Sequence, residues 1–238
     1  QAFDRGQFIA PNGQVFGTGE RGDLEATLAA ILLEESLFLQ DDPSNQLLTN
    51  GKIREPILRF THWVRAFDVA NIDSENEHKL RWTIDPVDGL GQHPFRSPSV
   101  FNFYRPGYIA PQTESGMIGL TAPEFQLVNE SSSVGYLNFM TDYTFERAWK
   151  TSDNQSTFVP DYSEEIAMSH DPQALIDHLD TLLTGNQMGE DEKTEIAAII
   201  GDMRLRLDDP EDEATDRDER AKVAIVLVMN SPAFAVVR

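Results

Sequence analysis

The chain has 238 residues, a mass of 26.7 kDa and a formal net charge of −21, from 19 basic and 40 acidic side chains. This length is enough for one large domain or two small ones with a buried core. The acidic balance argues against nucleic-acid binding, which needs clustered Lys and Arg side chains, and against anionic membrane surfaces. The longest apolar run, Val223 to Met229, is too short to span a bilayer. The absence of cysteine excludes disulfides, thiolate zinc sites and a cysteine nucleophile.

The first predicted helix covers residues 24–39, with Asp23 as its N-cap. Its segment 28–33 is apolar on nearly every side, so we expect this helix to lie deep in the core. A second helix begins at Pro56, a residue suited to the first helical position. Its apolar stripe leaves three polar residues largely off the buried face: Arg59, His62 and Arg65.

Thr121 to Glu124 reads as a capping box, with Thr as N-cap and Glu three residues later, and predicts a helix start. Residues 136–149 form another helix, whose inward face holds Tyr136, Phe139, Met140 and Tyr143.

Asp171-Pro172 opens an amphipathic helix that Gly185 closes. The next apolar stripe contains Ile196, Ile199, Ile200 and Met203. Residues 217–229 are expected to be helical, because helix-forming residues lead into the final apolar run and Ser231-Pro232 stops it. The prediction is a mainly α, irregular multi-helix domain with long ordered loops and little or no sheet, and with a possible sub-boundary near 153–161.

Gly17 to Gly22 matches the G-x-G-x-x-G pattern of dinucleotide sites. No confident strand precedes it, no βαβ pattern follows, and Glu20 and Asp23 would repel a pyrophosphate at the helix N-terminus. We therefore interpret it as a glycine-rich turn into a capped helix.

Residues 190–220 hold 13 acidic and 5 basic side chains. The run 208–218 is a possible calcium site, but it lacks the EF-hand spacing, and a solvated acidic loop is the favoured interpretation, so no cofactor is predicted. The five histidines show no zinc-ligand spacing, so no metal site is predicted from them.

The best candidate for a binding site is the loop 92–108, which is too irregular for a long element and too apolar for a solvated loop. Polar side chains there alternate with Phe95, Phe101 and Phe103, an arrangement typical of sugar- or peptide-binding surfaces. The alternative is that the aromatic rings anchor the loop to the core while the polar groups satisfy its own backbone. The candidate binding residues of this region are Gln92, His93, Arg96, Asn102 and Tyr104.

Five segments together resemble the bacterial domain-of-unknown-function 1800 family: RGDLEATLAAILLEES, GKIREPILR, LGQHPFRSPSVFNFYRPGY, LTAPEFQ and MNSPAFAVVR. The match corresponds to the C-terminal portion of that family, so we expect Gln1 to begin a fragment or a processed product. The resemblance implies a mainly helical fold and an exported, periplasmic or extracellular protein. It implies no established activity and no secure catalytic residue. Glu124 falls in one of the family motifs and joins the candidate binding residues, and Arg54 and Glu55 fall in another, where they would form an ion pair at the start of the second helix.

Two functions follow as hypotheses. The first is a binding or assembly component that uses the loop 92–108 with a protein partner, with the remainder of its own polypeptide or with an extracellular glycan. The second is a hydrolase acting on an extracellular polymer, in which Glu124, His93 or Asp85 supplies acid-base groups. A broad exposed aromatic patch favours binding, whereas a desolvated carboxylate or histidine in a closed pocket favours an enzyme.

Overall fold

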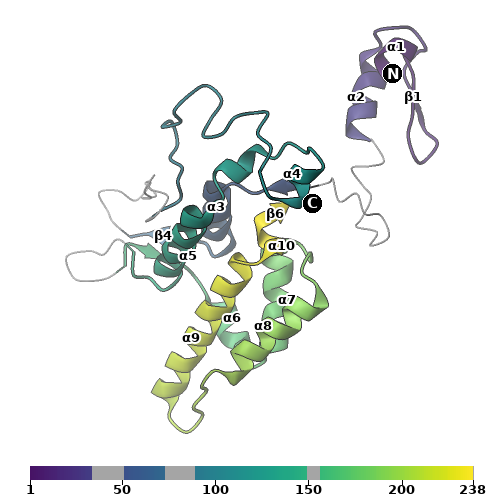
Figure 1. Cartoon of the computed structure of the whole chain (residues 1–238). Coiled ribbons are helices and arrows are strands. Elements are labelled where there is room, and N and C mark those ends of the chain that lie inside the picture. Colours follow the sequence, from purple (N-terminus) through teal and green to yellow (C-terminus); the bar gives the residue numbers. More distant parts are fainter. Residues whose placement is uncertain (34–50, 73–88, 149–155, 238) are drawn as a thin grey trace. The chain divides into compact units, whose positions relative to one another are not determined.

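The computed structural model describes residues 1–33, 51–72, 89–148 and 156–237 (Figure 1). The chain divides into two compact units, Gln1–Gly51 and Lys52–Val237. Most of the regular structure in the described residues is helical, and the strands are two residues long, paired in three two-stranded sheets. The prediction of a mainly α fold with little sheet is confirmed.

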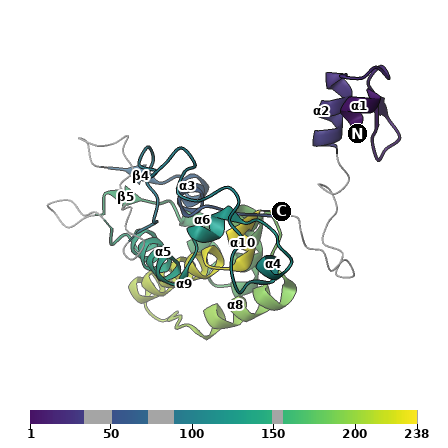
Figure 2. The ribbon, with the colours of Figure 1, turned by 45° about the horizontal axis from the view of Figure 1, so that its top comes forward.

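The described residues of the first unit form two helices and a small hairpin (Figure 2). It contains α1 (Ala2–Arg5), the antiparallel strands β1 (Phe8–Ile9) and β2 (Val15–Phe16), and α2 (Leu24–Leu32). Asp23 caps α2 as predicted, since its carboxylate accepts a hydrogen bond from the backbone N–H of Ala26 at 2.9 Å. The glycine-rich segment before it is a turn with φ of 91° at Gly17, where an added Cβ would lie 2.6 Å from the Ala26 side chain.

The described part of this first helix does not lie deep in the core as predicted, and residues 34–39 of the predicted helix lie outside the described residues. The buried residues of α2 are Ala26 and Ala29, while its large apolar side chains are exposed: Leu24, Leu28, Ile31 and Leu32. The small alanines face α1 and the hairpin, because only a small side chain fits where backbones approach this closely.

The second unit carries the remaining elements. Its first half holds β3 (Lys52–Ile53), α3 (Pro56–Ala66), β4 (Ala70–Asn71), α4 (Glu114–Met117), η2 (Pro123–Gln126) and α5 (Glu130–Thr144). Its second half holds β5 (Phe158–Val159), α6 (Ser163–Met168), α7 (Pro172–Leu179), η3 (Asp180–Thr184), α8 (Glu190–Asp202), α9 (Pro210–Met229), α10 (Pro232–Ala235) and β6 (Val236–Val237). Two antiparallel pairs, β3 with β6 and β4 with β5, tie the two halves together. The predicted sub-boundary near 153–161 stays a prediction.

The long helix α9 organises the packing of the second unit (Figure 1). It contacts α5, α6, α7, α8 and α10. Its helical state over 217–229 is confirmed, and the helix begins earlier than predicted, at Pro210, where the Asp209 carboxylate caps the first turn. In α8, Ile196 and Ile200 are buried as predicted, but Ile199 is exposed because it lies on the solvent side of the helix.

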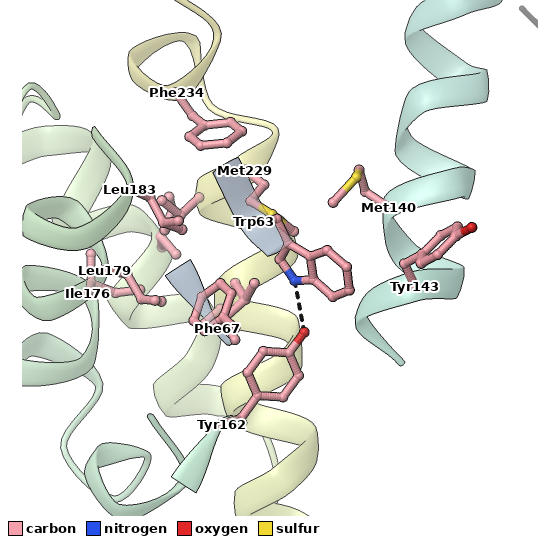
Figure 3. Packing of buried hydrophobic residues seen from close by; sticks show 14 of the residues in the cluster. Trp63, Phe67, Met140, Tyr143, Tyr162, Ile176, Leu179, Leu183, Met229 and Phe234 are labelled. Carbon is pink, nitrogen blue, oxygen red and sulfur yellow. Dashed lines mark hydrogen bonds between the residues drawn. The ribbon is translucent and has the colours of Figure 1, made fainter. Parts of the chain in front are cut away.

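An aromatic cluster forms the centre of the core (Figure 3). The Trp63 indole N–H of α3 donates a 2.9 Å hydrogen bond to the Tyr162 hydroxyl, which satisfies both polar groups within the apolar interior. Phe60 packs edge-on against Phe139 and Tyr143 of α5, with ring centroids 5.2 and 4.9 Å away. The predicted inward face of residues 136–149 is therefore confirmed, although α5 starts at Glu130 and ends at Thr144.

Two local predictions are wrong. Thr121 does not cap a helix: η2 begins at Pro123 without a side-chain cap, and the capping box of this region is formed by Asn129 and Ser132 at α5. Arg59 is buried rather than off the apolar face, because its guanidinium stacks on the Tyr136 ring, 3.8 Å from the ring centroid.

Within the described residues, no helix combines the length and the apolar content that crossing a membrane requires.

Candidate functional site

The loop 92–108 is anchored at its beginning by Gln92, which is buried against the start of α3. The Gln92 amide oxygen accepts a hydrogen bond from the Ile57 backbone N–H at 3.2 Å, one of the N–H groups that a helix start leaves unpaired. Its amide nitrogen donates to Oε2 of Glu55 at 2.5 Å. Gln92 therefore fastens the loop to α3 with both ends of its amide.

Tyr104, later in the loop, also binds Glu55. Its hydroxyl donates a 3.0 Å hydrogen bond to Oε1 of Glu55, so both carboxylate oxygens of Glu55 accept bonds from the loop. Burial raises the pKa of Tyr104 above its usual value, and the nearby carboxylates of Glu55 and Glu124 raise it further. A hydrogen bond from Asn102 opposes this shift. Tyr104 is thus held as a neutral donor.

The end of the loop is fastened to the segment around η2. The Arg105 backbone N–H donates to Oε1 of Gln126 at 2.5 Å, and the Ala122 backbone N–H donates to the Tyr108 carbonyl at 2.9 Å. Glu124 is buried beside this junction, with Nζ of Lys52 at 3.6 Å from its Oε1. The loop is therefore held at both ends.

Between these anchors the backbone forms three successive turns. Backbone N–H groups donate to the carbonyl three residues earlier at Arg96, Asn102 and Tyr108, over 3.0 to 3.2 Å. Phe95 and Asn102 adopt left-handed conformations, with φ of 61° and 67°. Asparagine tolerates this region, whereas a bulky aromatic residue there is strained.

The apolar side chains at the tip of this loop point into solvent. Relative to a fully extended residue, Phe95 is 107% exposed, Val100 is 95% exposed and Phe101 is 59% exposed. We call these three residues the apolar tip. Arg96 and Arg105 are exposed close to them in sequence, and residues 92–108 contain no acidic side chain.

The structure thus divides the predicted site residues into two groups. Gln92 and Tyr104 both bond Glu55 and form an internal polar cluster with it, Glu124 lies close enough for its charge to act on Tyr104, and Asn102 hydrogen-bonds Tyr104. His93 is half-buried, with Nδ1 at 2.9 Å from the Pro94 carbonyl, and Arg96 is exposed. The polar candidates near Glu55 are structural anchors, and the exposed residues between them include Arg96 and the apolar tip.

Sequence reasoning missed Glu55 as the centre of this cluster. Arg54 and Glu55 were expected to pair with each other, but in the described residues Glu55 bonds the loop, while Arg54 contacts His62 and stacks on Phe234. The sequence does contain a signal for this role, because Pro56 opens α3 and Glu55 therefore lies next to the N–H groups that a helix start leaves unpaired. A side chain at this position lies close to any group that bonds those N–H groups, as Gln92 does. Asp85 of the hydrolase hypothesis lies outside the described residues.

The acidic run 208–218 is engaged with basic partners. Asp216 accepts two hydrogen bonds from the Arg206 guanidinium at 2.8 and 2.6 Å, and Asp212 also contacts Arg206. Asp218 lies 2.9 Å from Lys222. No group of three or more His, Asp or Glu side chains in the described residues is arranged to hold a metal ion. Calcium binding by this run stays a prediction.

Comparison with known proteins agrees with the resemblance in the sequence. The family described as "Protein of unknown function (DUF1800)" matches residues 4–236, nearly the whole chain. No curated protein and no solved structure matches the chain. The chain therefore belongs to this bacterial family of unknown function.

Proposed function

We propose that this protein is a binding or assembly component whose apolar tip inserts into a hollow on a partner protein. The observation that carries the proposal is the exposure of Phe95, Val100 and Phe101 on a loop that is fastened at both ends. Exposed apolar side chains do not contribute hydrophobic free energy to folding, because their surface stays in contact with water. Burial of that surface against a partner makes this free energy available for binding. Because the anchors hold the loop before binding, little conformational entropy is lost on association.

The chemistry of the loop favours a protein over a glycan. A sugar site needs free hydrogen-bonding groups beside its aromatic platforms, but Gln92 and Tyr104 already bond Glu55. Val100 offers an aliphatic side chain, which fits an apolar hollow in a protein. Arg96 and Arg105, without any acidic residue in the loop, favour a partner with acidic groups around that hollow.

Site-specific photocrosslinking tests this proposal. A photoreactive phenylalanine analogue replaces Phe101 in the protein expressed in its source organism, and the crosslinked product is identified by mass spectrometry. The matched control places the analogue at Met117, which is 77% exposed on α4. We expect one defined protein product at position 101 and none at position 117. The same products at both positions, or a glycan product at 101, would overturn the proposal.

A hydrolase is the second candidate, and it is supported by the proximity of two carboxylates, Glu55 and Glu124, to Tyr104. It ranks second because both oxygens of Glu55 already accept hydrogen bonds from the loop. Glu124→Gln keeps the shape of the side chain and removes its acid-base chemistry. Hydrolysis of an extracellular polymer by the wild type that Glu124→Gln abolishes would favour the enzyme over the binding protein.

Export to the periplasm or the extracellular space is also part of the proposal. It is supported by the family to which the chain belongs, whose resemblance implied an exported protein. Fractionation of the source organism, with detection of this protein in the periplasmic or extracellular fraction, tests it. Confinement to the cytoplasmic fraction would contradict it.

A further inference from the structure

A second surface of the Lys52–Val237 unit is a groove on α3, distinct from the loop 92–108. It has a volume of about 480 Å³ and lies between α3, η3 and β6. Half of its lining is apolar, from Leu58, Ala66, Leu182 and Val237, and the other half is basic or polar, from Arg54, Thr61, His62 and Arg65. Among the described residues, no acidic side chain lines this groove.

The two arginines of the groove have no carboxylate partner among the described residues. The chain holds 40 acidic side chains for 19 basic ones, and other arginines are paired, as Arg206 is with Asp216 and Arg217 with Glu213. In a protein with two acids for each base, arginines without a carboxylate partner among the described residues have charge available to an external anion.

Arg54 is held in place by contacts that leave part of its guanidinium unused. It stacks on Phe234, 4.8 Å from the ring centroid, and Nη1 lies 3.2 Å from Nδ1 of His62. Since arginine is always protonated, Nδ1 of His62 accepts this bond, and Nε2 then donates to the Leu182 carbonyl at 3.3 Å. The backbone carbonyl of Leu183, 3.5 Å from Nη1, completes the contacts of Arg54. The Nε and Nη2 edge has no partner among the described residues.

His62 is uncharged in this arrangement. Burial lowers its pKa, the positive charges of Arg54 and Arg65 lower it further, and the Leu182 carbonyl opposes the shift. The cationic groups of the groove are therefore the two arginines, and Arg65 is close enough for its charge to act on His62.

We propose that this groove binds a small aliphatic carboxylate, with the carboxylate between Arg54 and Arg65 and the hydrocarbon chain along Leu58, Leu182 and Val237. The planar guanidinium edge matches the two oxygens of a carboxylate. Leu58 is 51% exposed and Val237 is 44% exposed, so a hydrocarbon chain laid on them buries apolar area that now faces water. The volume is in the range of sites for small molecules, about 300–1,000 Å³.

The test is titration of the full chain with sodium octanoate, followed by calorimetry and by ligand-observed NMR. Two further probes separate the parts of the ligand: 1-octanol has the same chain without the charge, and inorganic phosphate has charge without the chain. The main variant is Arg65→Gln, because Arg65 is exposed and its replacement leaves the core intact. The matched control is Arg147→Gln, another exposed arginine, which stacks on Phe145 as Arg54 does on Phe234.

We expect octanoate to bind more tightly than octanol and phosphate. Loss of one charge-assisted hydrogen bond in Arg65→Gln should weaken octanoate binding by about tenfold or more, and Arg147→Gln should bind as the wild type does. Equal binding of octanoate and octanol, tighter binding of phosphate, absence of octanoate binding, or an Arg65→Gln protein that binds like the wild type would each overturn the proposal.

Discussion

Phe95 sits in a conformation and an environment that folding does not favour. Its φ of 61° is in the left-handed region, and its side chain is fully exposed, so neither backbone preference nor burial stabilises it there. Strained residues of this kind are found where a structure holds a group for contact with another molecule. The combination of strain and exposure at one residue is what the proposed partner contact explains.

Replacing Phe95 with glycine therefore stabilises the fold while removing the contact. Relief of left-handed strain gains about 1–2 kcal/mol, more than the 0.5–1 kcal/mol that the freedom of glycine in the unfolded chain costs. We expect Phe95→Gly to raise the free energy of unfolding in urea titration and to lose partner binding. Phe95→Ala is the control, because it removes the ring, keeps the strain and leaves stability nearly unchanged. A less stable Phe95→Gly would show that the ring packs against the protein.

Gln92, unlike Phe95, stabilises the fold, because both ends of its side-chain amide form hydrogen bonds within the protein. In Gln92→Leu, the Ile57 N–H and the Glu55 carboxylate each lose a buried partner, which we expect to lower the free energy of unfolding by about 2 kcal/mol. Gln187→Leu is the control, since its side chain is exposed in the same unit, and its effect should be within about 0.5 kcal/mol. Equal effects of the two variants in urea denaturation would argue against the anchoring role.

At the scale of elements, Asp216 of α9 binds Arg206 in the segment that precedes the helix. Asp216 accepts hydrogen bonds from Nε and Nη2 of Arg206 and from the Arg206 backbone N–H. These hydrogen bonds and the positive charge of Arg206 lower the pKa of Asp216 from 3.8 to about 2. Because the pKa is lower in the folded than in the unfolded chain, the ionised form stabilises the fold. This contribution is complete above pH of about 4 and is lost as the pH falls through about 2.

The free energy of unfolding should therefore fall more steeply between pH 4 and pH 2 in the wild type than in Asp216→Asn, measured by urea titration at each pH. Asp208→Asn is the control: Asp208 is an exposed aspartate of the same acidic run, and its variant should keep the wild-type slope. If Asp216→Asn shows the wild-type slope as well, the pair with Arg206 does not contribute to stability.

Chelation tests the calcium hypothesis for residues 208–218. Since Asp212, Asp216 and Asp218 face basic partners and Asp209 caps α9, we expect the melting temperature to be the same with and without EDTA. A bound ion stabilises the folded state, so a melting temperature that falls in EDTA and returns with excess calcium would establish the metal site.

At the scale of the whole molecule, the predictions that succeeded depend on neighbours in sequence. Helix periodicity and local caps placed α3, α7 and α9, with Pro56, Asp171 and Gly185 at the expected termini. These signals involve side chains within one or two turns of each other. They are therefore readable without knowledge of the tertiary structure.

The predictions that failed depend on partners far along the chain. Arg59 is buried because Tyr136 lies under it, and Gln92 turns inward because Glu55, 37 residues earlier, accepts its hydrogen bond. The apolar face of α2 shows the same limit: periodicity identifies an apolar face but does not identify what covers it. Composition singles out the loop 92–108 as a candidate, but which of its side chains face solvent is set by these distant contacts.

Native mass spectrometry of protein purified gently from its source organism shows directly whether the apolar tip binds a partner protein. The comparison is between the wild type and a variant in which Phe95, Val100 and Phe101 are all replaced by serine. The matched control replaces Met117 and Ile118, two exposed apolar residues of the neighbouring segment, with serine. We expect a complex heavier than the polypeptide alone in the wild type and in the control, and we expect the tip variant to lose this complex. The mass of the polypeptide alone in all three samples, or a complex that survives in the tip variant, would contradict it.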